Sequence, residues 1–454
     1  MKHVLFWLVY FWCVTDAGAQ EAMLERFLES PELKHASVGI SVKTVKGGRN
    51  VIDYAGDKAL QPASVCKLLA TALAWREKGK DFCYETSVVM TGKIEEGTLW
   101  GDIVVRAAGD PCLESRFFPD EEFMERLVEN ICQQGIRKIQ GKVRITGNQE
   151  VALPGSWLWE DISNYYGAAY FPFNYRDNTY YIGFRTGEVG EKADLLFVKP
   201  EQPGVRFVSD VVAGVGRTDN ACIYGGPYSG EMRVVGNLPR NRKLYTIKGA
   251  MHRPDLCFLH ELEQKLNEKG VVVVKEALPE TEEKELAVFR SPTLKEIVRE
   301  TNKKSINLFA EALGNLASGG DYPAYCCREL EGIGIDTSGI TLRDACGLSV
   351  VNAVPAEVFT DLLLWVHDEL RWDFVASLPL AGTDACLSAY CSAAPVLKNK
   401  LRAKTGSFAG VRCLSGYLTK KDGDILAFTI LVNHFTCPPV QIQKRIGQFL
   451  ASLL

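Results

Sequence analysis

Hydrophobic and polar positions alternate near the start of the chain in a way that predicts a strand pair followed by a buried helix. The segments Ala36 to Val45 and Arg49 to Tyr54 alternate around the Gly47-Gly48 turn, which is typical of a hairpin. The segment Pro62 to Trp75 is apolar nearly all round and rich in helix formers, with proline at a suitable first helical position. We expect this helix to be buried at the centre of a domain.

The pattern of hydrophobic and polar residues is different between about residue 84 and residue 284. Short alternating segments such as Ser87 to Gly92 and Gly101 to Arg106 surround one amphipathic helix near Glu121 to Gln134. This pattern predicts a β-rich insertion over 84–284. A stretch dense in aromatic, glycine and turn residues favours a smaller domain nested around 160–225.

The C-terminal part returns to helices and ends on strands and one further helix. Three strands are predicted over Arg402 to Ser407, Arg412 to Leu418 and Ile425 to Val432, and an amphipathic helix over Val440 to Leu454. With the two N-terminal strands, these elements predict one α/β domain that the long insertion splits.

Length, charge and the N-terminus narrow the class of protein. At 454 residues the chain is long enough for two or three domains. Its net charge of −4 shows no excess of basic residues that would favour binding to nucleic acid. Residues 1–19 have the three-part pattern of a cleavable secretory signal. A membrane anchor is the alternative, but the apolar run is shorter than the ~20 residues that a span needs. We therefore expect an exported, periplasmic protein with no transmembrane anchor.

Cysteine and histidine usage supports neither a disulfide framework nor a metal site. Of the 14 cysteines one lies in the predicted leader, no two form a CxxC pair, and several have apolar neighbours, as Cys257 does. Buried thiols are thus favoured over bridges. His252 and His260 are the closest histidines, and no HExxH pattern is present, so we expect no metal and no cofactor.

Three short motifs in one order carry the candidate chemistry: Ser64-Val65-Cys66-Lys67, Ser305-Ile306-Asn307 and Lys404-Thr405-Gly406. Ser64 and Lys67 are three residues apart on one helical face, so the amine can reach the hydroxyl. A serine hydroxyl needs a base to become a good nucleophile, and a desolvated lysine with a lowered pKa can serve. Gly406 lies in a predicted strand, where we expect it to permit close approach by a ligand backbone.

The motifs and their spacing resemble those of penicillin-recognising serine enzymes. Because 241 residues separate Ser64 from Ser305 and 99 separate Ser305 from Lys404, the first gap holds an entire extra region. Such an insertion is similar to that of the low-molecular-mass class C penicillin-binding proteins, the D-alanyl-D-alanine carboxypeptidase/endopeptidase or penicillin-binding protein 4 family. Further stretches resemble this family as well: Gly109-Asp110-Pro111, Asn164 to Ala168, Gly347-Leu348-Ser349 and Leu378 to Gly382.

The resemblance implies a β-lactamase/transpeptidase-like catalytic domain over 20–83 and 285–454, with a five-stranded antiparallel sheet flanked by helices. It also implies a peptidoglycan stem peptide as substrate and β-lactam antibiotics as covalent inhibitors. Ser64 would be acylated with Lys67 as base, and Ser305 and Lys404 would relay a proton to the leaving amine. The remaining implied contacts are Asn307 with the acyl-side peptide, Thr405 and Ser407 with the terminal carboxylate, and the amides of Ser64 and Ser407 with the oxyanion.

One departure from the family pattern concerns specificity for the third residue of the stem peptide. The family usually has an arginine where this chain has Val350, and that arginine is associated with binding the charged side chain of the third residue. Asp161 and Tyr166 match insertion positions associated with the same pocket, although a carboxylate and an aromatic residue there are equally compatible with a structural role.

Two other functions remain open at this stage. A β-lactamase or esterase on the same domain would deacylate penicillin quickly, and the long first gap argues against it. A penicillin-sensing or wall-binding module would hold ligand without turnover, and release of D-alanine would exclude it. The sequence does not decide between carboxypeptidase and endopeptidase activity.

Overall fold

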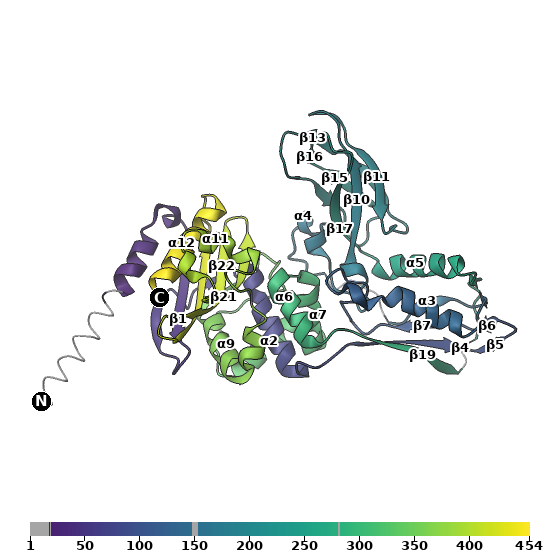
Figure 1. Ribbon diagram of the computed structural model, residues 1–454, viewed down its shortest axis with the longest axis horizontal. Helices are drawn as coiled ribbons and strands as arrows, with labels where there is room; N and C mark the ends of the chain where they lie inside the picture. The colour runs from purple at the N-terminus through teal and green to yellow at the C-terminus, as the bar shows by residue number, and fades with distance from the viewer. Residues whose placement is uncertain (1–17, 19, 148–152, 280–281) are drawn as a thin grey trace, which may run out of the picture. The chain divides into compact units, whose positions relative to one another are not determined.

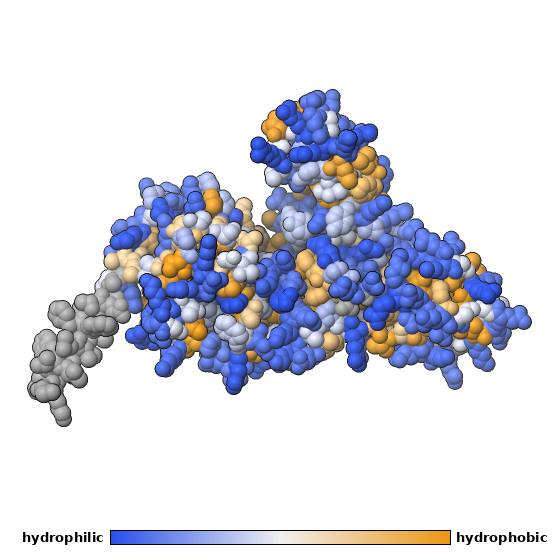
Figure 2. Space-filling view, viewed as in Figure 1, coloured by the Kyte–Doolittle hydropathy of each residue, from blue (hydrophilic) through white to orange (hydrophobic). Residues whose placement is uncertain are grey.

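The computed structural model describes residue 18 and residues 20–147, 153–279 and 282–454. The predicted leader, residue 18 apart, therefore lies outside the described residues. No helix in the described ranges is long and apolar enough to cross a membrane. On the face drawn in Figure 2, hydrophilic residues predominate and hydrophobic ones form small scattered groups.

The chain divides into two compact units. The first unit contains the chain up to Gly79, together with Lys295–Ile306 and Leu313–Leu454. The second unit contains Lys80–Leu294 and Asn307–Ala312. Three separate segments of the sequence thus build the first unit.

A five-stranded antiparallel sheet forms the centre of the first unit (Figure 1), as predicted. The N-terminal hairpin joins the three C-terminal strands because β1 pairs with β23 over eight residue pairs, from Ser37↔Asn433 to Thr44↔Leu426. The strand order is β2-β1-β23-β22-β21. The bounds are Ser37–Thr44 for β1, Asn50–Tyr54 for β2, Leu401–Phe408 for β21, Val411–Thr419 for β22 and Ile425–Asn433 for β23.

The two faces of this sheet have different partners. On one face Thr360 of helix α9 (Ala356–Glu369) lies 3.0 Å from the Thr429 hydroxyl, which is 2.8 Å from that of Ser415. On the opposite face the fully buried Ile40 and Val42 belong to a hydrophobic cluster that also contains residues of helix α12 (Pro439–Ser452). The sheet is therefore covered by helices on both sides.

The C-terminal helix packs on the sheet through the predicted apolar stripe. Ile442, Ile446 and Leu450 are fully buried, and Phe449 contacts Phe27 at 4.8 Å between ring centroids. Helical spacing places these residues on one face. The confirmed stripe makes α12 a core element of the first unit.

The predicted central helix is also present, but its first turn is tighter than an α-helix. A 3-10 turn, η2 (Ala63–Cys66), leads into helix α2 (Lys67–Lys78), and every residue from Lys67 to Trp75 is buried. Burial on all sides explains why this segment shows almost no polar face. The tight turn contains the first candidate motif.

The second unit is rich in short strands and contains two hydrophobic clusters. One cluster lies among helices α3 (Phe123–Gln133) and α5 (Pro254–Glu268) and two four-stranded sheets of β18-β8-β6-β5 and β19-β4-β7-β9. Those strands are β4 (Glu85–Thr91), β5 (Lys93–Glu95), β6 (Thr98–Trp100), β7 (Ile103–Arg106), β8 (Lys138–Ile139), β9 (Val143–Ile145), β18 (Val272–Val273) and β19 (Glu283–Arg290).

The residues of the other cluster lie between Tyr180 and Cys257 in the sequence. They pack among three small sheets with the strand orders β11-β10-β17, β12-β15-β14 and β13-β16. Two cores within one unit reflect the limited thickness that short strands can bury. The strands are β10 (Thr179–Arg185), β11 (Asp194–Lys199), β12 (Arg206–Ser209), β13 (Val212–Gly214), β14 (Cys222–Tyr224), β15 (Glu231–Val235), β16 (Asn237–Pro239) and β17 (Tyr245–Ala250).

The cysteines of the described residues, Cys66 to Cys437, are all free thiols. Many are buried, including Cys66, Cys346 and Cys413. Burial raises the pKa of the Cys413 thiol to about 12. These cysteines act as small apolar core residues, as the sequence favoured.

Replacing Ile446 by alanine tests the role of helix α12. The side chain is fully buried, so Ile446→Ala should lower the free energy of unfolding by about 2 to 5 kcal/mol. Urea denaturation measures this change. The control is Val440→Ala on the same helix, because Val440 is 43% exposed and its removal should alter stability by less than about 0.5 kcal/mol. Equal stability of the two variants would show that α12 is not part of the core.

Candidate active site

The first candidate motif forms a direct contact between an amine and a hydroxyl. Lys67 Nζ donates a hydrogen bond to Ser64 Oγ at 2.9 Å and another to the carbonyl oxygen of Cys346 at 2.6 Å. Lys67 has no exposed surface, whereas Ser64 is partly exposed. The 3-10 turn places residues i and i+3 almost in line, so the Lys67 side chain lies on the same side of the turn as Ser64. The Lys67 amine, which can accept or donate a proton, is therefore in contact with the hydroxyl of the partly exposed Ser64.

The backbone that carries Ser64 is held between two glycines. Ala63 has a φ of +47°, a left-handed conformation that is costly for a residue with a side chain. A Cβ at Gly347 would lie 2.0 Å from the Ala63 carbonyl oxygen, and one at Gly406 would lie 2.4 Å from that of Pro62. Only glycine fits at either position. Gly406 therefore lets the chain's own Pro62 carbonyl come close to the strand, and the approach of a ligand at Gly406 stays a prediction.

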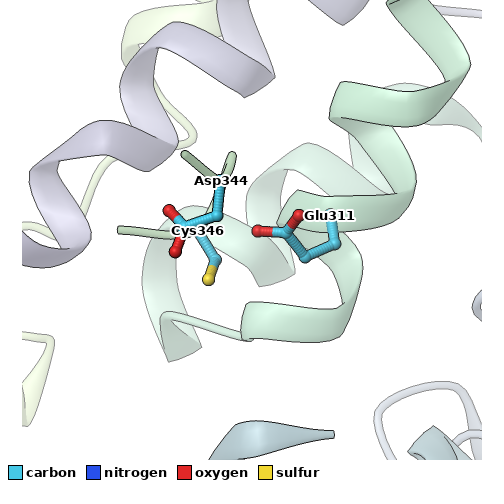
Figure 3. A group of neighbouring side chains, drawn as sticks. All are labelled: Glu311, Asp344 and Cys346. Atoms are coloured by element: carbon cyan, nitrogen blue, oxygen red, sulfur yellow. The ribbon is translucent and has the colours of Figure 1, made fainter. Parts of the chain in front are cut away.

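A carboxylate fixes the loop that supplies the Cys346 carbonyl. Asp344 accepts hydrogen bonds from the amides of Gly347 at 2.7 Å and Ser349 at 2.6 Å, and from the Asn352 side chain at 2.8 Å. Figure 3 shows Asp344 and Cys346 on this loop. Asp344 is 3% exposed, so these bonds compensate for the burial of its charge. The resemblance marked Gly347 and Ser349, but no sequence signal gave the role of Asp344.

The second serine and the third motif meet in the same unit. Lys404 Nζ donates to Ser305 Oγ at 2.8 Å and to the Thr405 carbonyl at 2.9 Å. Ser305 lies between helices α6 (Leu294–Lys304) and α7 (Asn307–Ser318) with a φ of +59°. Burial and, secondarily, the positive charge of Lys67 hold the pKa of Lys404 well below its usual value. The structure therefore brings Ser64, Lys67, Ser305 and Lys404 together.

Strand β21 presents the remainder of the third motif. Thr405 pairs with Leu414 and Ser407 with Arg412 of β22, so the motif is held in regular antiparallel register. Ser407 is exposed and Thr405 is partly exposed. Both hydroxyls are accessible to a ligand.

The remaining candidate residues lie together in the second unit. Asp161 of helix α4 (Trp159–Ile162) shares a hydrogen bond with the phenol of Tyr166, which is 38% exposed. Burial raises the pKa of both groups, and the tyrosine hydrogen bond partly opposes this for Asp161. Asn307 Nδ2 donates to the Tyr166 carbonyl oxygen at 2.7 Å. The pair Asp161–Tyr166 is thus linked directly to the asparagine of the second motif.

Comparison with known proteins gives relatives along nearly the whole chain. The D-alanyl-D-alanine carboxypeptidase DacB of Haemophilus influenzae is 24% identical over 433 residues, covering 90% of this chain and 88% of that protein. The D-alanyl-D-alanine carboxypeptidase of Actinomadura sp. (strain R39) is 27% identical over 479 residues, covering 94% and 84%.

Solved structures show the same fold. The crystal structure of penicillin-binding protein 4 from Haemophilus influenzae has a TM-score of 0.77 and 22% identity, covering 92% of this chain and 97% of that chain. The same protein in complex with a β-lactam gives a TM-score of 0.72 over 92% of this chain and 96% of that chain. These neighbours confirm the predicted fold class.

A family model matches residues 20–453, almost the full length of the chain. Its description is the D-Ala-D-Ala carboxypeptidase 3 (S13) family. The match confirms the resemblance that the three motifs and their spacing indicated. The chain belongs to the D-Ala-D-Ala carboxypeptidase 3 (S13) family of serine peptidases.

Proposed function

We propose that this chain removes D-alanine from peptidoglycan stem peptides through an acyl-enzyme on Ser64. The observation that carries the proposal is a pair of buried lysines, Lys67 and Lys404, each with its amine on the hydroxyl of a different serine. A purely structural role would not require two buried lysine amines near each other, since burying an amine that can carry a charge is costly. The domain that performs the reaction is the one over 20–83 and 285–454.

Acylation begins with Lys67 in its neutral form. Its amine takes the proton from Ser64 Oγ as that oxygen bonds to the carbonyl carbon of the penultimate D-alanine. The backbone amides of Ser64 and Ser407 donate to the resulting oxyanion. The peptide C–N bond then breaks, and water later hydrolyses the ester to regenerate the Ser64 hydroxyl.

Protonation of the leaving amine falls to the second serine and lysine. Ser305 gives its hydroxyl proton to the amine and receives one from Lys404 along the 2.8 Å hydrogen bond. Lys404 suits this exchange because its pKa is lowered by burial, so its ammonium form gives up a proton readily. The Ser305–Lys404 pair thus acts as a proton relay, and the proton that Lys67 took from Ser64 passes to Lys404 before the next cycle.

Substrate binding uses five further residues. Thr405 and Ser407 hold the terminal carboxylate, and Asn307 binds the acyl-side peptide through its side-chain amide. Asp161 and Tyr166 bind the side chain of the third stem residue. β-Lactams acylate the same serine because their strained amide mimics the D-Ala-D-Ala peptide bond.

The proposed substrate indicates the compartment in which the reaction takes place. Peptidoglycan lies outside the cytoplasmic membrane, so the enzyme acts after export, with residues 1–19 as its signal and the periplasm as its compartment. The relatives from Haemophilus influenzae and Actinomadura are named carboxypeptidases, which favours that activity over cross-link cleavage here.

Penicillin labelling tests the identity of the nucleophile. Ser64→Ala should abolish covalent labelling by a fluorescent penicillin, because Ser64 is the hydroxyl that Lys67 contacts. Ser392→Ala provides the control, since this exposed serine donates only to the backbone of its own helix turn. Peptide mapping of the wild-type adduct to any residue other than Ser64 would contradict the proposal.

Replacing Lys67 by arginine tests the base. Arginine keeps the positive charge but cannot lose a proton at useful pH, so Lys67→Arg should lower the acylation rate by about 10²- to 10⁴-fold. Stopped-flow acylation measures the rate, and Lys78→Arg on the same helix should leave it unchanged. A near-wild-type rate in Lys67→Arg would assign the base role to another group.

Val350 provides a test of specificity. An arginine paired with a ligand carboxylate contributes about 1.5 to 3 kcal/mol, which valine does not offer. We expect stem peptides with diaminopimelate at the third position to be preferred over lysine peptides by a smaller margin than in arginine-bearing relatives. Val350→Arg should widen the ratio of kcat/KM for the two peptides.

The matched control for this test is Val351→Arg, because Val351 is the adjacent residue and 45% exposed. It should leave the ratio unchanged. A strong diaminopimelate preference in the unmodified enzyme would show that another basic residue, such as Arg343, replaces the family arginine.

A further inference from the structure

A cavity of about 120 Å³ lies in the first unit, on the sheet face that carries Lys404. Pairing between neighbouring strands brings four of its lining residues together. Arg402 is directly opposite Tyr417, and the amide of Thr419 donates to the carbonyl of Lys400 at 2.9 Å. Side chains two residues apart on a strand point to the same face, about 7 Å apart. Lys400, which directly precedes β21, is therefore followed by Arg402 and Lys404 along the strand.

The walls of the cavity are partly aromatic and aliphatic. The guanidinium of Arg402 lies 5.3 Å from the ring centroid of Trp372, on helix α10 (Arg371–Val375), and this tryptophan is 58% exposed. The ring of His367 is 6.1 Å from that of Tyr417. Aliphatic side chains complete the lining: Val375, Leu380 and Ile425.

The charged side chains that line the cavity are basic, while Asp368, outside the lining, lies 3.5 Å from the His367 ring. Besides Tyr417, the ionisable residues that line it are His367, Lys400 and Arg402, and no carboxylate is among the lining residues that the structure describes. The carboxylate that acts on the pKa of Arg402 is that of Asp384. That carboxylate already accepts a hydrogen bond from the Leu380 amide at 2.8 Å and pairs with Lys303 at 3.4 Å.

Arg402 is left with unused hydrogen-bonding capacity. Its guanidinium has five N–H donors, and among the described residues it donates one hydrogen bond, to the Leu378 carbonyl at 3.3 Å. Burial lowers the pKa of Arg402, and the Asp384 carboxylate partly opposes this shift. An anion in the cavity would supply the missing partner.

We propose that this cavity binds a small monocarboxylate through Arg402 and Lys400. The planar fork of a guanidinium matches a carboxylate in two parallel hydrogen bonds. A short alkyl chain fits against Trp372 and Leu380, and the volume admits only a few heavy atoms. Because no lining carboxylate is present to pair with an ammonium group, the site disfavours zwitterionic amino acids.

Calorimetric titration of the full chain with sodium propionate tests the proposal, with sodium chloride at the same ionic strength as the salt control. We expect saturable binding at one site, and at least tenfold weaker binding of D-alanine. The measurement uses no step of the proposed hydrolysis, so it can fail while that function stands. Heats indistinguishable from chloride, or D-alanine binding as tight as propionate, would overturn the proposal.

Variants locate the site. Arg402→Met should weaken propionate binding at least tenfold, and Lys400→Met should weaken it as well. Arg412→Met is the matched control because Arg412 lies on the neighbouring strand, has a pKa lowered by burial and sits 5.9 Å from the Phe435 ring, yet does not line the cavity. If Arg402→Met does not fold, the affinity of Lys400→Met for propionate tests the site. Unchanged affinity in the folded variants would place the carboxylate elsewhere and refute the site.

Discussion

The buried amine of Lys67 is the constraint on which the active region depends. A lysine with no exposed surface must find hydrogen-bond acceptors inside the protein, or its charge is prohibitively costly. Its acceptors include Ser64 Oγ and the Cys346 carbonyl. The loop around Cys346 must therefore approach η2 closely, and several otherwise unrelated residues serve that approach.

Two glycines and one aspartate hold the backbone around η2 and the Cys346 loop. Gly347 and Gly406 leave room for the Ala63 and Pro62 carbonyls, while Asp344 anchors the loop by its amides. Strain appears where these contacts converge, at the positive φ of Ala63. Such strain persists only where the surrounding structure fixes the backbone, and it is common next to catalytic groups. In this protein it fixes the position of the Ser64 hydroxyl.

The sequence predicted the elements well where periodicity was strong. The five sheet strands and helix α12 agree with prediction because alternation and helical spacing directly report which face is buried. The motif serines and lysines were found because each motif is a short local pattern, and because the order and spacing of the three motifs resemble those of a known family. The role of Asp344, the Pro62 carbonyl beneath Gly406 and the cavity at Arg402 were not found, since each depends on residues brought together by strand register or by loop contacts between distant segments.

The most direct measurement of the central claim is mass spectrometry of a pentapeptide stem ending in D-Ala-D-Ala, incubated with the enzyme in water enriched in ¹⁸O. Hydrolysis of an acyl-enzyme should shorten the peptide by one D-alanine and place one ¹⁸O in its new carboxylate. Release of D-alanine should stop after this single residue. A peptide that remains intact with protein that still binds penicillin would contradict the account and indicate a binding module instead.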